Sequence, residues 1–261
     1  MSERKMLFND GAAYEKMMGN WSRLVGEVFI EWLTFNPGLR WLDVGCGNGA
    51  FSDLISSSCE PVAVHGIDPS TEQINFAQSR QIAAPATFQL GDAMALPLDD
   101  NNFDIAVMAL VIFFVPNPAK GVAEMVRTVR PGGIVASYTW DRVNKGSPSD
   151  LVSQELRKIG FKPGSPPNSQ ASEMSALENL WSSAGISTIE SRRITVERKF
   201  RNINEYWNIT SLTPNIQHIV PLLTAAQIDE VKRRLQEHLS VDADGRISQH
   251  ATANAIKGIV V

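Results

Sequence analysis

Short apolar segments and amphipathic segments alternate along the first 140 residues. The apolar segments read RWLDVG, VAVHGID, ATFQLGD, FDIAVMALVIFFV and GGIVASYTW. Between the fourth and fifth, a stretch that begins at Asn117 and Pro118 has apolar residues at i, i+3, i+4 and i+7, namely Val122, Met125, Val126 and Val129. This alternation predicts an α/β fold, with parallel strands and crossover helices on both faces of the sheet. The unbroken apolar run at 105–115 predicts a central strand that is buried on both faces.

Capping signals place further helices. Three residues that can cap a helix are each followed by Gln or Glu at the third position, in the pairs Ser70/Gln73, Ser175/Glu178 and Thr224/Gln227. This pattern predicts helices that run to about Arg80, to just before Gly185 and to about Leu239. The pattern from Asn202 to about Leu239 is helical. Alternating residues at 186–200 predict a strand, and a final strand is predicted at about 246–260.

Composition limits the class of protein. The chain has 261 residues, 43% of them hydrophobic, which is enough for one large core and a smaller appendage. The net charge is −4 and no run of Lys or Arg stands out, so we expect no nucleic-acid partner. The longest apolar run is well short of the roughly 20 residues that a spanning helix needs, and the first ten residues are charged. We therefore expect a cytoplasmic protein with no stable membrane insertion.

Candidate ligand-binding residues follow three of the predicted strands. Gly45, Gly47 and Gly49 come directly after the first strand, where bare backbone lets a ligand approach the N–H groups of a helix start. Asp68 ends the second strand, where a carboxylate can accept hydrogen bonds from two adjacent ribose hydroxyls. Asp92 ends the third strand, within reach of the other end of a nucleoside. Taken singly, each feature also fits a plain role, because glycines serve tight packing and acids cap helices.

The ordered motifs LDVGCGNG, GIDPS, GDAMALPLDDNNFDIAVMALVIFFVPNP and RPGGIVASYTW resemble those of class I S-adenosylmethionine-dependent methyltransferases. The group that includes the ubiquinone and menaquinone C-methyltransferases is the most similar. The resemblance covers about residues 40–140. It implies a seven-stranded, doubly wound, mostly parallel sheet of the Rossmann-like methyltransferase type. It also implies S-adenosyl-L-methionine as cofactor and S-adenosyl-L-homocysteine as product.

The resemblance also implies roles for single residues. The three glycines would pass close to the methionine part of the cofactor, and Asp43 would organise their loop. Asp68 would take the ribose hydroxyls, and Pro69 would pack near the adenine. Asp92 would accept a hydrogen bond from the adenine amino group. The backbone N–H of Ala93 would read the ring edge, and Ala109 would lie near the transferable methyl group.

The family pattern divides the chain into three parts. Residues 1–36 would form a helical lid and residues 37–140 the cofactor-binding core. Residues 141–261 would complete the sheet at about 186–200 and 246–260, with helical cap insertions at about 141–175 and 201–245. The N-terminal lid and the two insertions would close a pocket for a small-molecule methyl acceptor. Its candidate wall residues are Tyr14, Trp21, Phe114, Trp140 and His218.

No catalytic residue can be named from the sequence. Methyl transfer from a sulfonium is an in-line displacement, so positioning can suffice without a base. The chain reads VIFFVPNP where some relatives carry a histidine after the fourth strand. Cys46 and Cys59 form no CxxC pair, and no metal-ligand cluster is seen. Two other functions remain open, a nicotinamide-dependent oxidoreductase and a non-catalytic S-adenosylmethionine-binding protein. The loop spacing GxGxG and the presence of Asp92 weigh against the first, and oligomeric state is not predicted.

Overall fold

The computed structural model describes residues 19–261, and their strands form one eight-stranded sheet. The strand order is β3-β2-β1-β4-β5-β8-β6, and a short β7 pairs with β8. The strands are β1 (Arg40–Val44), β2 (Ala63–Asp68), β3 (Ala86–Leu90), β4 (Phe103–Ala109), β5 (Val129–Trp140), β6 (Ser187–Phe200), β7 (Ser240–Val241) and β8 (Ile247–Ile259). β1 to β5 are parallel, whereas β8 runs antiparallel to both β5 and β6. The predicted α/β class with a mostly parallel sheet is confirmed, and the extra strand relative to the predicted seven is the two-residue β7.

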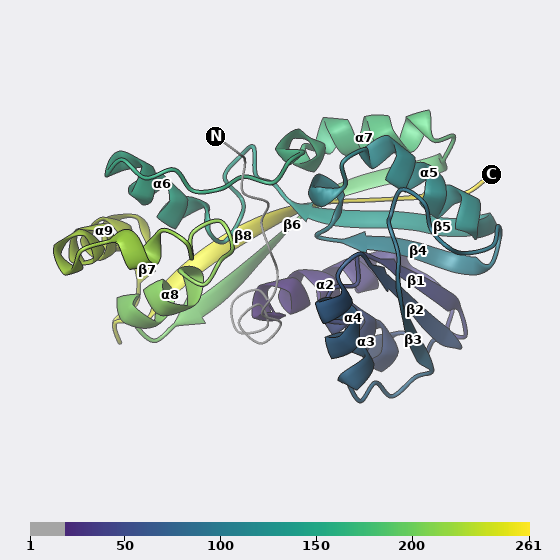
Figure 1. Cartoon of the computed structure of the whole chain (residues 1–261), viewed down its shortest axis with the longest axis horizontal. Coiled ribbons are helices and arrows are strands. Elements are labelled where there is room, and N and C mark those ends of the chain that lie inside the picture. The colour runs from purple at the N-terminus through teal and green to yellow at the C-terminus, as the bar shows by residue number, and fades with distance from the viewer. Residues whose placement is uncertain (1–18) are drawn as a thin grey trace.

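Helices cover both faces of the sheet. They are α2 (Asn20–Leu33), α3 (Ala50–Ser58), α4 (Thr71–Ser79), α5 (Pro118–Thr128), α6 (Asp150–Lys158), α7 (Met174–Ser183), α8 (Ile203–Thr210) and α9 (Ala225–His238). Short 3-10 helices are η2 (Ile112–Phe114), η3 (Ser169–Ser172) and η4 (Val220–Leu222). Figure 1 shows α2, α3 and α4 on one side of the sheet and α5 and α7 on the other. None of the helices among residues 19–261 is long and apolar enough to cross a bilayer.

Two apolar cores lie against the two faces. Phe29, Ile55 and Tyr138 belong to the core under α2 and α3, and Met125 and Trp181 belong to the core under α5 and α7. The buried Trp181 indole N–H donates a hydrogen bond to the Val135 carbonyl at 3.0 Å. The central strand β4 is therefore buried on both faces, as its apolar run predicts, whereas the outer strands β3 and β6 are largely exposed.

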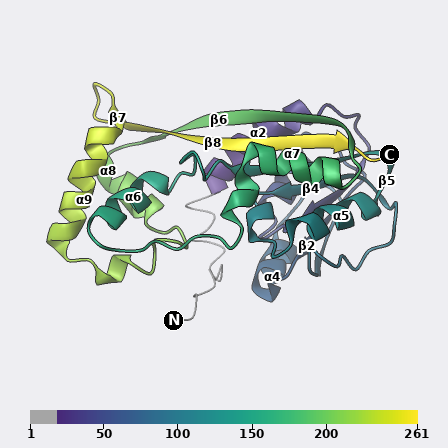
Figure 2. The same ribbon diagram turned by 90° about the horizontal axis from the view of Figure 1, so that it is seen from above.

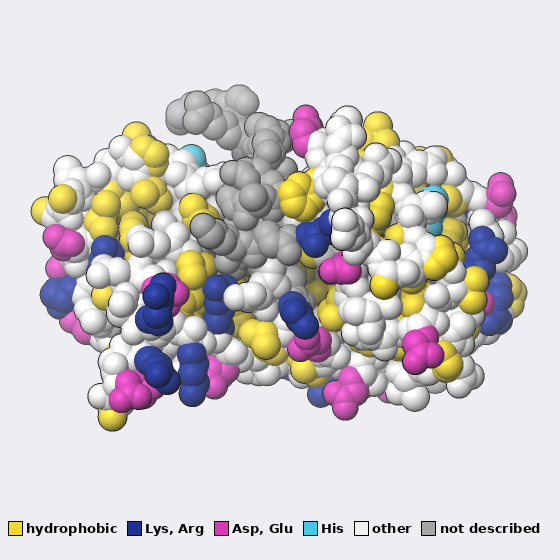
Figure 3. Space-filling view, turned by 90° about the horizontal axis from the view of Figure 1, so that it is seen from below, with side chains coloured by type: hydrophobic (Ala, Val, Ile, Leu, Met, Phe, Trp, Pro, Cys, Tyr) yellow, Lys and Arg dark blue, Asp and Glu magenta, His cyan; other side chains and the backbone are white. Residues whose placement is uncertain are grey.

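β6 and β8, at 14 and 13 residues, are only slightly longer than the 12-residue β5, but both continue beyond its end at Trp140. Their far ends extend past the parallel strands and carry α6, α8 and α9, which form a second lobe (Figure 2). On the face drawn in Figure 3, basic and acidic side chains are interspersed over both lobes. That face therefore lacks the basic stripe that follows a phosphate backbone.

Local capping signals explain several helix starts. The Asn117 side chain accepts from the Lys120 N–H at 3.2 Å at the start of α5, with Pro118 in its first turn. At α4, the Ser70 hydroxyl accepts from the N–H of Gln73. At α9, Thr224 and its N3 glutamine form a complete capping box.

Three expectations about element boundaries were wrong. The apolar run at 105–115 is strand only to Ala109, because Leu110 adopts a left-handed φ of 64° and the chain then turns into η2. α7 begins at Met174, and Ser175 does not cap it; Glu178 instead accepts a hydrogen bond from Ser191 on β6. The segment 201–239 is not one helical stretch, because η4 and its flanking loops separate α8 from α9.

Candidate functional site

The glycine loop joins the carboxyl end of β1 to the first turn of α3. The N–H groups of Gly45 and Cys46 both donate to the Ile67 carbonyl, at 2.7 and 3.0 Å, which ties the loop to β2. A Cβ on Gly45 would lie 2.5 Å from the Val111 side chain, so this glycine is required by packing. Gly47 has a positive φ of 52°, and the nearest atom to its would-be Cβ is 4.0 Å away. The loop therefore leaves room beside the half-buried backbone at Gly47.

Asp68 connects the end of β2 to this loop. Its Oδ2 accepts from the Gly47 N–H at 2.9 Å, and its Oδ1 accepts from the Ser70 N–H at 2.9 Å. Burial raises the pKa of this carboxyl group, and the two amide hydrogen bonds act in the opposite direction. The carboxylate thus holds the two strand-to-helix turns at a fixed separation. Pro69, the next residue, is exposed.

Asp43 lies on β1 just before the loop and is completely buried. Its Oδ2 accepts from the Ser52 hydroxyl of α3 at 2.7 Å, whereas Oδ1 has no hydrogen-bond partner among the described residues. Burial raises the pKa of Asp43 to about 7; the hydrogen bond from Ser52 lowers it, and the nearby Asp68 charge raises it further. A buried acid with one unsatisfied oxygen is costly to the fold, which is typical of a functional position.

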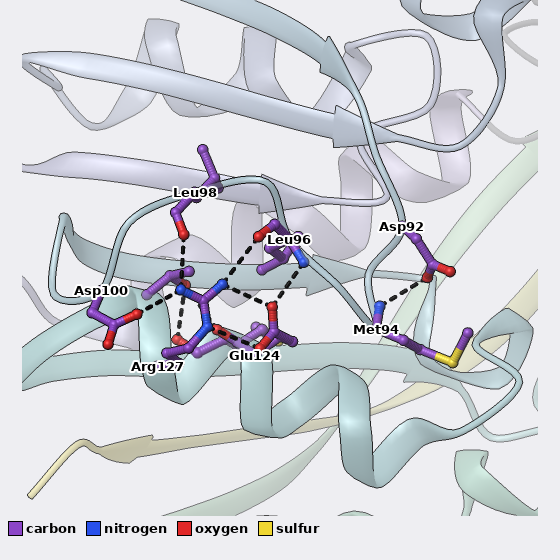
Figure 4. Close-up of polar contacts among 9 residues, drawn as sticks. Asp92, Met94, Leu96, Leu98, Asp100, Glu124 and Arg127 are labelled. Carbon is purple, nitrogen blue, oxygen red and sulfur yellow. Dashed lines mark hydrogen bonds and ion pairs between the residues drawn. The ribbon is translucent and has the colours of Figure 1, made fainter.

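Asp92 and Ala93 form an exposed turn after β3. The Asp92 Oδ1 accepts from the Met94 N–H at 2.8 Å (Figure 4), and the Ala95 N–H donates to the Asp92 carbonyl at 3.0 Å. The Gly91 N–H donates to the Asp68 carbonyl at 3.1 Å, which joins this turn to β2. The turns that follow β1, β2 and β3 therefore meet at one edge of the sheet.

The end of β4 carries a feature that the sequence did not indicate. Ala109 is half-buried, and Leu110 after it has a left-handed backbone and donates its N–H to the Tyr138 carbonyl at 2.8 Å. A leucine in this conformation is strained, and such strain is held by surrounding structure, often at functional sites. No residue-type signal could have found it, because leucine favours neither turns nor positive φ.

The predicted pocket-wall residues lie in different surroundings. Trp21 and Trp140 are both buried, with ring centroids 6.5 Å apart in an edge-on arrangement. Phe114 is half-buried and contacts Phe113, with 4.4 Å between the ring centroids. His218 is exposed on the segment between α8 and η4. Tyr14 lies outside the described residues.

The two cysteines and the acidic residues show no metal chemistry. Cys46 and Cys59 are free thiols, and burial raises the pKa of both, that of Cys59 to about 12. No group of three or more His, Cys, Asp or Glu side chains within residues 19–261 is arranged to hold a metal ion. The polar groups that the described residues bring together at this edge are backbone N–H groups and the carboxylates of Asp43, Asp68 and Asp92.

Comparison with known proteins agrees with this geometry. Residues 42–137 match a family model described as "Methyltransferase domain". Two curated relatives are a fatty-acid O-methyltransferase of Mycolicibacterium smegmatis, 32% identical over 48% of each chain, and a demethylmenaquinone methyltransferase of Desulfitobacterium hafniense, 34% identical over 41% of this chain and 45% of the relative. The chain spans about half the length of the curated relatives it matches.

A solved structure of similar fold is phosphoethanolamine N-methyltransferase 2 of Haemonchus contortus in complex with S-adenosyl-L-methionine. It is 19% identical to this chain and has a TM-score of 0.59. The match covers 98% of this chain and 58% of that one. At this identity the likeness concerns the fold alone. Together, the matched segment and the fold bear out the predicted resemblance: residues 42–137 match a methyltransferase domain, and the sheet has the Rossmann-like methyltransferase fold.

Proposed function

We propose that this protein transfers a methyl group from S-adenosyl-L-methionine to a small-molecule acceptor, mainly by positioning the two reactants. The observation that carries the proposal is the joined edge of the sheet, where the Asp68 carboxylate holds the glycine loop through the Gly47 N–H. Relatives named as methyltransferases of a fatty acid and of demethylmenaquinone support a small acceptor. The methyl group is transferred to an oxygen, carbon or nitrogen atom of the acceptor.

The described residues suit the cofactor in two respects. Gly47 leaves space beside its backbone, and Asp43 has a buried carboxylate oxygen without a partner among residues 19–261. In the proposed site, Gly45, Gly47 and Gly49 take the methionine part, and Asp43 fixes their loop through Ser52. Asp68 and Pro69 take the ribose and the neighbouring ring face.

The remaining roles follow the chain to β4. Asp92 and the Ala93 N–H recognise the adenine edge, and Ala109 lies beside the methyl group. The cofactor, when bound, supplies an already activated methyl on a sulfonium, so the protein's task is to align an acceptor and exclude water. Of the N-terminal segment 1–36, the described residues 19–36 would close the acceptor pocket together with the segments 141–175 and 201–245, around residues such as Phe114 and His218.

Isothermal titration calorimetry tests the cofactor part first. The wild type should bind S-adenosyl-L-methionine and S-adenosyl-L-homocysteine, and should not bind NAD. Asp68→Ala should weaken binding by about 1.5–3 kcal/mol, or roughly ten- to a hundredfold, because the ribose hydroxyls lose a charged acceptor. Asp229→Ala, at an exposed acid on α9, is the matched control and should bind like the wild type.

Two outcomes would overturn parts of the proposal. Binding of NAD in place of S-adenosyl-L-methionine would favour a nicotinamide-dependent oxidoreductase and would refute the assignment of the loop. Tight cofactor binding without transfer of a labelled methyl group to fatty acids, quinols or amines would favour a non-catalytic binding protein.

A further inference from the structure

Arg127, near the C-terminal end of α5, is bonded to the loop between β3 and β4. Its Nη1 donates to the Leu98 carbonyl at 2.8 Å and to Asp100 at 2.6 Å, and its Nη2 donates to the Leu96 carbonyl at 3.0 Å. Nε and Nη2 also donate to the two oxygens of Glu124, at 2.9 and 2.8 Å (Figure 4). Every N–H direction of the guanidinium is thus engaged, and two of them hold backbone carbonyls of one loop.

Glu124 completes the attachment from the same face of α5. Its Oε2 accepts from the Leu96 N–H at 2.8 Å, so both the N–H and the carbonyl of Leu96 are bonded to this helix. The Leu96 side chain is buried in the core beneath. The pKa of Glu124 lies below its ordinary value, first because of the hydrogen bonds from Arg127. The pair therefore acts as one charged clamp on the loop.

The clamp lies next to the exposed turn that contains Asp92 and Ala93. That turn is fixed on its N-terminal side by the Gly91 N–H bond to the Asp68 carbonyl. On its C-terminal side, the first anchor is Leu96, and that anchor is made by Arg127 and Glu124. Without the clamp, the turn would keep a hydrogen bond to the sheet at one end only, and its other attachment would be the apolar packing of Ala93, Met94 and Leu96.

We propose that Arg127 and Glu124 are positioning residues for adenine recognition, which they support by fixing the turn that presents Asp92 and Ala93. The inference rests on the proposed function, since it needs the adenine ring to be read at this turn. Neither residue is a catalytic residue, because both act through the loop. A lysine at 127 offers only three N–H donors from a single nitrogen and cannot make the five hydrogen bonds of the planar arginine fork, so the conservative variant should fail to replace arginine.

The test compares two ligands that differ only in the base edge. S-adenosyl-L-homocysteine carries the exocyclic amino group of adenine, whereas S-inosyl-L-homocysteine carries a carbonyl oxygen there. The wild type should prefer the first by about tenfold, since Asp92 accepts from that amino group. Asp92→Ala should remove most of this preference. Arg127→Gln and Arg127→Lys should each reduce it to about threefold or less.

Coupling and control variants separate positioning from general stability. In the double variant Asp92→Ala with Arg127→Gln, the loss of preference should equal that of Asp92→Ala alone, because both act on one contact. Arg233→Gln, which breaks exposed ion pairs with Glu230 and Glu237 on α9, should leave the preference at its wild-type value. If Arg127→Gln does not fold, Glu124→Gln is measured in its place.

The outcomes are distinguishable. A lower melting temperature for Arg127→Gln with an unchanged preference for adenine would overturn the inference and leave the proposed function standing. Additive losses in the double variant would also overturn it. If the wild type binds neither ligand, the proposed function fails and this inference fails with it.

Discussion

Two regions of the molecule use their buried groups in opposite ways. One is the edge of the sheet that carries the candidate site, and the other is the junction between the two lobes, where α2, β5 and β6 meet. At the site edge, Asp68 accepts from backbone N–H groups of two turns, and Asp43 buries a carboxylate with one oxygen unpaired among the described residues. At the junction, Trp21 packs against Trp140 and Phe200, with ring centroids 6.5 and 6.4 Å apart. The first region buries a carboxylate at a cost to stability. The second gains stability mainly by aromatic burial, although the buried Trp140 indole N–H has no hydrogen-bond partner among the described residues.

This difference teaches where function and stability can be separated. α2, β5 and β6 each supply one ring to the junction, so any change there weakens the contact between elements far apart in the sequence. The site edge is made of turns whose side chains contribute little apolar burial. We therefore expect junction variants to change unfolding free energy and site variants to change binding or its pH dependence.

The largest effect is expected for Trp21→Ala. Trp21 is 2% exposed, so its truncation removes a large apolar surface and leaves a cavity, at a cost of about 3–5 kcal/mol in unfolding free energy. Urea unfolding measures the change, and Leu222→Ala, at a residue that is 66% exposed, should lie within about 0.5 kcal/mol of the wild type. A stable Trp21→Ala protein with a raised KM for the acceptor would instead make Trp21 a wall of the substrate pocket.

The next effect concerns the cost of the buried acid at the site edge. Burial raises the pKa of Asp43 to about 7, so the folded protein keeps a proton that the unfolded chain loses near pH 4. The contribution of this group to stability is therefore greatest below about pH 4, falls as the pH rises to about 7, and stays low above that. Asp43→Asn stays neutral and its carbonyl oxygen can still accept from Ser52.

Urea unfolding between pH 4 and pH 8 measures this difference. The unfolding free energy of Asp43→Asn, taken relative to that of the wild type, should be higher at pH 8 than at pH 4 by on the order of 3 kcal/mol. Asp229→Asn, at an exposed acid, should track the wild type at every pH. A difference between Asp43→Asn and the wild type that does not vary with pH would show that Asp43 ionises near its ordinary pKa.

The same two regions differ in how far the sequence predicts them. The parallel strands follow from continuous apolar runs, and the starts of α5 and α9 follow from cap residues at Asn117 and Thr224, because these signals act within a few residues. The glycine loop and Asp68 can likewise be read from spacing. Their apposition through the Gly47 N–H depends only on neighbouring parallel strands.

What the sequence did not predict depends on contacts between distant residues. The left-handed turn at Leu110 is held by a bond to Tyr138, 28 residues away along the chain, and leucine itself gives no turn signal. The Arg127 contacts reach back about 30 residues to Leu96 and Leu98, and no local pattern in the sequence indicates them. The second lobe depends on the unusual length of β6 and β8, which local periodicity does not place in space.

The smallest effect is expected where a loop from the second half of the chain reaches the site side of β4. Asn168 donates from its side-chain Nδ2 to the Val115 carbonyl at 2.5 Å and from its backbone N–H to the Phe113 carbonyl at 3.1 Å. It lines a pocket of about 260 Å³ together with Pro118, Pro166, Pro167, Ser169, Gln170 and Ala171. This loop therefore joins the pocket to the turn after Ala109.

Asn168→Ala keeps the backbone bond and removes both side-chain bonds, to the Val115 and Pro116 carbonyls, so the expected cost is about 1 kcal/mol in unfolding free energy. Because the loosened turn follows Ala109, the KM for the methyl acceptor should rise a few-fold, while the Kd for S-adenosyl-L-homocysteine should stay unchanged. Steady-state kinetics and calorimetry measure the two quantities, and Asn75→Ala, at an exposed residue on α4, is the control. A weaker Kd for S-adenosyl-L-homocysteine with an unchanged acceptor KM would contradict this prediction. It would show that the loop supports the cofactor site and not the acceptor pocket.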